Sequence, residues 1–146
     1  MILEKFQLEG RVAIVTGCNT GLGQGMARAL AQAGADIVGV NVSDPTETRA
    51  EIEGLGRRFM DLRANLADIS CLEGLVVEAL RLTGRIDILV NNAGIIRRED
   101  AIKFSEKDWD DVIDLTLKTV FFFSQAVARQ FIAQGQGGKI INVASM

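Results

Sequence analysis

Residues 16–23 form a glycine-rich turn whose composition suits the binding of a phosphate group. The turn reads Thr16-Gly17-Cys18-Asn19-Thr20-Gly21-Leu22-Gly23 and lies between a short apolar run and a segment with helical spacing. Gly17 permits a sharp exit from a strand, Gly21 lets the backbone approach a pyrophosphate, and Gly23 lets the next helix pack on the sheet. Three residues separate the first two glycines of the turn, two more than in the G-x-G-x-x-G pattern. The turn predicts dinucleotide binding, with a plain tight turn as the alternative.

Two residue types are missing from the chain, and their absence limits its chemistry. There is no His and no Tyr among the 146 residues. Histidine triads, metal sites that use His and tyrosine-based proton transfer are therefore excluded within these residues. Proton chemistry would have to use Ser, Thr, Asn, Lys or a carboxylate. We expect no metal site.

The composition is that of one globular domain over residues 1–146. Hydrophobic residues make up 48% and charged residues 24% of the chain. A net charge of -3 gives no electrostatic reason to expect nucleic acid or an anionic membrane as a partner. No apolar run approaches the roughly 18 residues of a membrane span. Two cysteines, Cys18 and Cys71, are too few for a disulfide framework, which predicts a reduced, cytoplasmic protein.

Short apolar runs alternate with longer segments of helical spacing. The runs cover residues 12–15, 37–40, 58–62, 86–90 and 139–143. Four of them are almost continuously apolar, as in parallel strands that are covered on both faces. The run at 58–62 contains Arg58 and Asp61, which favours an edge strand.

The helical segments carry recognisable ends. Residues 23–33 precede Gly34, which favours a helix that ends there. Asp44 is placed to cap a helix with Pro45 at its first position, and Asp68 a helix over 69–82 that stops near Gly84. A long helix begins after Ser105 and runs toward residue 134. The alternation predicts an α/β fold with a doubly wound parallel sheet.

Three motifs in this order resemble the short-chain dehydrogenase/reductase family. Residues 16–23 resemble its T-G-x-x-x-G-[IL]-G signature, residues 91–94 its N-N-A-G motif, and residues 140–145 its fifth strand leading into a catalytic serine. The resemblance implies a Rossmann sheet in the order 3-2-1-4-5. It also implies a single dinucleotide-binding domain over 1–146 that is incomplete, because its sheet is truncated after the fifth strand.

The resemblance implies an oxidoreductase that transfers a hydride between NAD(H) and a secondary alcohol or ketone. Ser145 falls at the position of the serine that holds the substrate oxygen. Thr116 stands where the family often has an Asn that relays protons through water. The family's Tyr-x-x-x-Lys pair would follow about a dozen residues after Ser145, so these residues alone are expected to be inactive or nearly so. The alternatives are a non-catalytic dinucleotide-binding fragment, or a reductase of another polyol or ketoacyl substrate.

Cofactor contacts implied by the resemblance fall at the ends of the predicted strands. They are Gly17, Asn19, Thr20, Gly21, Leu22, Gly23, Asn41, Asn65, Leu66, Asn92, Ala93 and Gly94. At the end of the second strand, Asn41 stands where an acidic residue would accept a hydrogen bond from the adenosine ribose. No basic residue follows in the chain until Arg49, which favours NAD over NADP.

Further segments, among them 17–27, 95–101 and 104–112, are similar to family members that act on deoxy sugar acids. Arg97 could hold the carboxylate of such a small-molecule substrate. The alternative is a solvated basic pair with Arg98, balanced by Glu99 and Asp100. The long helix is apolar nearly all round, which favours a homo-oligomer (a tetramer at full length) over complete burial within one chain.

Overall fold

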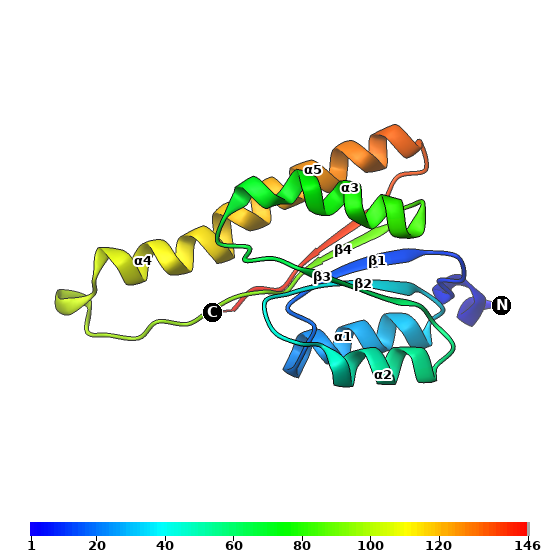
Figure 1. Cartoon of the computed structure of the whole chain (residues 1–146), viewed down its shortest axis with the longest axis horizontal. Coiled ribbons are helices and arrows are strands. Elements are labelled where there is room, and N and C mark those ends of the chain that lie inside the picture. The colour runs from blue at the N-terminus through cyan, green and yellow to red at the C-terminus, as the bar shows by residue number, and fades with distance from the viewer. Residues whose placement is uncertain (146) are drawn as a thin grey trace.

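Five parallel strands form a single sheet in the computed structural model, which describes residues 1–145 (Figure 1). The strands are β1 (Val12–Thr16), β2 (Asp36–Asn41), β3 (Phe59–Arg63), β4 (Ile88–Asn91) and β5 (Lys139–Asn142). Their order is β3-β2-β1-β4-β5, so the predicted doubly wound arrangement is confirmed. Every residue of β1 is buried, whereas β3, at one edge, has only Phe59 and Leu62 buried.

Helices cover both faces of the sheet (Figure 1). They are α1 (Gly21–Gln32), α2 (Thr46–Gly54), α3 (Leu72–Thr83), α4 (Glu106–Ile113) and α5 (Thr119–Gln134). One buried cluster joins α1 and α2 to one face of the sheet through Ala27, Ala31 and Ile52. A second cluster joins α3 and α5 to the other face through Val76 and Phe123. The glycine turn therefore connects the central strand to a helix that is packed directly on it.

Two helix starts differ from their predictions. The helix predicted to be capped by Asp44 has Pro45 as its cap and begins at Thr46. The Asp44 carboxylate, one residue before this cap, accepts from the Thr46 hydroxyl at 2.6 Å. Asp68 does cap, accepting from the Ser70 N–H, but it caps a 3-10 turn (Ile69–Cys71) that leads into α3. The predicted helix end at Gly84 is confirmed, with φ at +77°.

The long helix is continuous from Glu106 to Gln134 but contains one π-helical segment, Asp114–Lys118, between α4 and α5. Two further 3-10 turns lie at Ile2–Phe6 and Ala101–Lys103. The π segment includes Thr116, whose hydroxyl donates to the Val112 carbonyl at 2.5 Å. A π-helical turn holds more residues than an α-helical turn, and the apolar pattern did not predict it.

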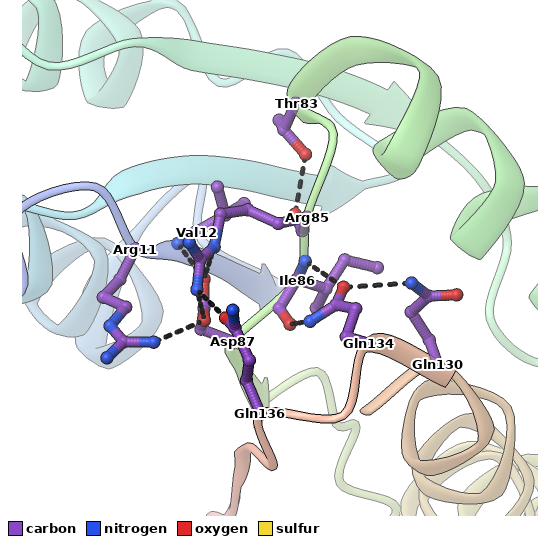
Figure 2. A network of polar contacts seen from close by, with 9 residues as sticks. All are labelled: Arg11, Val12, Thr83, Arg85, Ile86, Asp87, Gln130, Gln134 and Gln136. Atoms are coloured by element: carbon purple, nitrogen blue, oxygen red, sulfur yellow. Dashed lines mark hydrogen bonds and ion pairs between the residues drawn. The ribbon is translucent and has the colours of Figure 1, made fainter. Parts of the chain in front are cut away.

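A polar network closes the end of the sheet opposite the glycine turn (Figure 2). Asp87 accepts from Arg11 at 3.0 Å, from Arg85 at 2.5 and 2.8 Å, and from the Val12 N–H at 2.9 Å. Burial alone would raise the pKa of this carboxyl, but the bonds from Arg85, Val12 and Arg11 outweigh it and hold the pKa below its ordinary value. The network thus joins β1 to the segment that enters β4.

The same network explains why β4 begins later than predicted. The side-chain amide of Gln134, at the end of α5, bonds both the N–H and the carbonyl of Ile86, at 2.9 and 2.8 Å (Figure 2). Ile86 therefore satisfies its backbone through a helix side chain and not through a strand neighbour. Backbone bonds to the neighbouring strands begin at Asp87, whose N–H donates to the Val12 carbonyl, and β4 starts at Ile88 and not at residue 86.

Apolar side chains remain exposed on two parts of the molecule. On the long helix Phe123, Val127 and Phe131 are buried, whereas others stay exposed, among them Trp109, Leu117, Phe121 and Ile132. All four residues of β5 are exposed. Burial within this chain accounts for only one face of the helix, so the homo-oligomer stays a prediction. Within residues 1–145, no helix is long and apolar enough to cross a membrane.

Candidate dinucleotide-binding site

A cavity of about 620 Å³ opens at the carboxyl ends of the strands. It is lined by Gly17, Asn19, Thr20, Leu22, Gly23, Val40, Asn41, Val42, Ala64, Asn65, Leu66, Ala67, Asn92, Ala93, Gly94, Ile95, Arg97, Asp111 and Leu115. The residues predicted to contact the cofactor all line it except Gly21, and Arg97 lines it as well. Thr116 and Ser145 do not belong to the lining. The cavity therefore collects segments that lie far apart in the chain.

The glycine turn has a backbone that side chains would obstruct. Gly17 and Gly21 have φ angles of +64° and +59°, in the region that favours glycine. A Cβ on Gly23 would lie 2.1 Å from the Gly17 carbonyl oxygen and 2.4 Å from Nδ2 of Asn92. Because such contacts are impossible, α1 approaches the turn as closely as it does only with glycine at position 23.

The amino end of α1 is suited to an anion. Thr20, at its N-cap, makes no side-chain bond to the helix backbone, and the first turn contains no acidic residue. The first N–H groups of a helix have no intrahelical acceptors and carry partial positive charge. With Thr20 and Leu22 in the cavity wall, these groups meet the requirements of a pyrophosphate.

Thr16 and Asn92 lock this turn to the segment after β4. The Thr16 hydroxyl accepts from the N–H groups of Asn92 and Ala93, both at 2.9 Å. In return, Nδ2 of Asn92 donates to the carbonyls of Thr16 and Gly17, at 3.1 and 3.0 Å. The motifs at 16–23 and 91–94 thus form one rigid unit that shapes the floor of the cavity.

Thr48, on α2, is hydrogen-bonded to the backbone of the glycine turn. The sequence did not predict it as a site residue. It is fully buried, and its hydroxyl donates to the Cys18 carbonyl at 2.8 Å while accepting from Nε2 of Gln24 at 3.1 Å. The only signal in the sequence is its spacing from Ile52, four residues later, which places a polar side chain on the buried face of α2.

Asn41 supplies an acceptor at the end of β2. The residue is 4% exposed, and its Nδ2 donates to the Sγ of Cys18 at 3.5 Å. Burial raises the pKa of the Cys18 thiol, so this sulfur stays neutral. The Oδ1 atom of Asn41 is buried without a hydrogen-bond partner among residues 1–145. A buried acceptor of this kind is costly unless a donor reaches it, and a ribose hydroxyl is such a donor.

The opposite end of the cavity is bounded by Gly94 and Arg97. A Cβ on Gly94 would lie 3.5 Å from the methyl carbon of Thr116, so Thr116 lies just behind the cavity wall. Arg97 forms ion pairs with Asp108 at 3.5 Å and Asp111 at 3.6 Å, both on α4. Its partners are thus not Glu99 and Asp100, which the sequence analysis gave as the acidic residues that could balance a solvated basic pair.

Ser145 lies three residues beyond the last residue of β5 and is exposed. Close by, Asn91 joins β4 to β5, because its Nδ2 donates to Oδ1 of Asn142 at 2.9 Å and to the Ser124 hydroxyl at 3.1 Å. Ser145 is therefore at the carboxyl edge of the sheet, outside the cavity lining. In the described part of the chain, no three His, Cys, Asp or Glu residues cluster as metal ligands.

Residues 11–146 match the short chain dehydrogenase family, and the chain belongs to that family. Over all 146 residues it is 64% identical to the 2-dehydro-3-deoxy-D-gluconate 5-dehydrogenase of Escherichia coli (strain K12). The chain spans 58% of the length of that relative.

Solved structures of relatives share the fold. A protein from Agrobacterium tumefaciens described as a 2-deoxy-D-gluconate 3-dehydrogenase, with bound NADP, is 47% identical with a TM-score of 0.86. The match covers 96% of this chain and 55% of that one. The carveol dehydrogenase of Mycobacterium avium, in complex with NAD, is 28% identical with a TM-score of 0.89, over 95% of this chain and 56% of that one.

Proposed function

We propose that this chain binds NAD(H) and takes part in hydride transfer to or from a secondary alcohol of a deoxy sugar acid, such as 2-dehydro-3-deoxy-D-gluconate. The observation that carries the proposal is the cavity whose wall is formed by the glycine turn at residues 17–23 and the motif at residues 91–94. The substrate class rests on the name of the Escherichia coli relative. We also propose that residues 1–146 form one dinucleotide-binding domain.

The chain would hold the cofactor along its length, at the pyrophosphate and at both ends. Backbone N–H groups of the turn and of α1 would bind the pyrophosphate, and Asn65 and Leu66 would contact the adenine. The bound dinucleotide would supply the hydride, or accept it, at its nicotinamide. The nicotinamide end of the cofactor would lie against Asn92, Ala93 and Gly94, near Arg97 and Thr116.

NAD is favoured over NADP by the acceptor at the end of β2. Oδ1 of Asn41 is buried beside the cavity and needs a donor, which the ribose 2′-hydroxyl of NAD provides. A 2′-phosphate has no proton to offer such an acceptor at neutral pH, when it is a dianion. Relatives with known structures hold either dinucleotide, and NAD is the one that we propose for this chain.

The remaining roles belong to Ser145, Thr116 and Arg97. Ser145 would hold the substrate oxygen and Arg97 the substrate carboxylate, although Asp108 and Asp111 compete for its guanidinium. The Thr116 hydroxyl donates to Val112, so toward a relay water it would act as an acceptor. With no Tyr or His among the 146 residues, proton transfer has no efficient acid here.

A titration with NADH, read by cofactor fluorescence, tests binding, and a hydride-transfer assay tests turnover. We expect saturable binding by the 146-residue chain. With 2-dehydro-3-deoxy-D-gluconate and NADH, we expect a rate at least about 100-fold below that of the Escherichia coli relative assayed in parallel, because general acid catalysis typically contributes about 10²–10⁴. An absence of saturable binding would refute the proposed function, and turnover equal to that of the relative would refute the role given to the missing tyrosine.

A further inference from the structure

A basic residue stands beside Asn41 in space although none is near it in the sequence. The ladder between β2 and β3 ends with Asn41 opposite Arg63. Arg63 immediately precedes Ala64, and Asp44 follows two residues after Val42; Ala64 and Val42 both line the cavity. Arg63 and Asp44 therefore adjoin segments of the cavity wall, at the end assigned to the adenosine ribose, without lining the cavity themselves.

The charge of Arg63 is already engaged by two carboxylates. Its Nη2 lies 3.3 Å from Oδ1 of Asp44, and its Nε donates to Oδ2 of Asp61 at 2.7 Å. Asp61 is mostly buried, with 15% of its side chain exposed, whereas Asp44 is 72% and Arg63 45% exposed. Asp61 thus anchors the guanidinium from the sheet, and Asp44 covers its outer edge.

Asp44 is charged at neutral pH. The hydroxyl of Thr46 donates to it, and with the nearby charges of Arg63 and Arg49 this bond holds the pKa of the Asp44 carboxyl below its ordinary value. The ionised Asp44 carboxylate is thus able to pair with Arg63. A phosphate arriving there would meet repulsion from Asp44 before it could reach Arg63.

We propose that Asp44 sets the cofactor preference of this site by occupying Arg63, so that Arg63 is unavailable to a 2′-phosphate. The proposal rests on the proposed function and adds a residue that discriminates between the two dinucleotides. Specificity of this kind comes from a repulsive element as much as from an attractive one. Removing the Asp44 charge would leave an exposed guanidinium that can turn toward a phosphate, which arginine binds in bidentate geometry.

Calorimetric titrations with NADH and NADPH, and with 5′-ADP and 2′,5′-ADP, test the proposal. Asp44→Asn is expected to raise the affinity for the 2′-phosphorylated ligand relative to its partner by about tenfold, since a charge adjacent to a phosphate acts at short range. Asp44→Asn combined with Arg63→Gln should return the ratio to the wild-type value. The matched control is Glu47→Gln, which removes an exposed carboxylate three residues away and should change the ratio less than about twofold.

Three results would overturn the proposal. The first is an unchanged ratio in Asp44→Asn, and the second is an equal gain in Glu47→Gln, which would indicate net charge and not the ion pair. The third is a wild-type preference for NADPH. If the wild-type chain binds neither dinucleotide, the proposed function itself fails, and the binding titration alone shows this before any variant is made.

Discussion

At the scale of single residues, the shape of the glycine turn depends on side chains outside the turn as well as on its glycines. Thr16 and Asn92 fix the turn to the segment after β4 through four hydrogen bonds. Thr48 reaches it from α2, across thirty residues of chain, and holds the Cys18 carbonyl. A backbone that must present N–H groups to a pyrophosphate benefits from such support, because a preorganised site loses less entropy on binding.

Thr48 gives a direct test of this support. In Thr48→Val the side chain keeps its size but loses the hydroxyl that bonds Cys18 and Gln24, whereas Thr48→Ser keeps the hydroxyl. Since one hydrogen bond contributes about 0.5–1.5 kcal/mol, NADH should bind about 3- to 10-fold more weakly to the Val variant. We expect the Ser variant to stay within about twofold of wild type in the same titration. A loss in the Ser variant with wild-type affinity in the Val variant would instead assign the effect to packing of the methyl group, which Val keeps and Ser lacks.

At the scale of elements, one end of the sheet forms the cavity and the other is held by a network of polar side chains. The carboxyl ends of β1 to β4 lead into loops that form the cavity, while the amino ends of β1 and β4 are fixed by Asp87 and its two arginines (Figure 2). Asp87 is 5% exposed. Its ionised form gains more from Arg85, Val12 and Arg11 than burial costs, so the folded state favours the carboxylate.

Asp87→Asn should therefore lower the free energy of unfolding at pH 7 by about 1–3 kcal/mol, measured by urea denaturation. The folded-state pKa is depressed, so the contribution of Asp87 is complete above its unfolded value near 3.9 and is lost as the pH falls through the folded value. The difference between wild type and variant should shrink accordingly at acidic pH. Glu78→Gln, which removes an exposed carboxylate paired with Arg81, should have no measurable effect. A difference that grows on acidification would contradict this account.

The sequence allowed the main elements of the fold to be predicted, because apolar runs and capping residues act locally. The strand order followed from the family resemblance, and of the twelve cofactor contacts that the resemblance implied, all but Gly21 line the cavity. Contacts between distant segments could not be predicted this way: Thr48 on Cys18, Gln134 on Ile86 and Arg63 beside Asn41. Each pairs ordinary polar residues whose spacing carries no motif. The π segment at Asp114–Lys118 was missed because the long helix is apolar nearly all round, so its sequence has no clear periodicity that a wider turn would shift.

At the scale of the whole molecule, the fold places a cavity at the carboxyl edge of the sheet and leaves apolar surface elsewhere. Trp109 and Phe121 on the long helix are each 60% exposed, and β5 is exposed along its length. Exposed apolar patches of this kind are typical of surfaces that other protein covers. The predicted homo-oligomer would cover part of this surface. Because the chain spans 58% of the length of its Escherichia coli relative, the activity of the complete protein remains part of the proposal.

The central claim is that the turn at residues 17–23 holds the dinucleotide, and two glycines of α1 test it most directly. A Cβ at position 23 would collide with the Gly17 carbonyl, whereas a Cβ at position 25 would meet nothing within 4 Å. The measurement is the NADH dissociation constant of wild type, Gly23→Ala and Gly25→Ala, each shown to be folded by its circular dichroism and unfolding midpoint. We predict at least about tenfold weaker binding for folded Gly23→Ala and wild-type affinity for Gly25→Ala. Equal affinity of the two folded variants would contradict the placement of the cofactor at this turn.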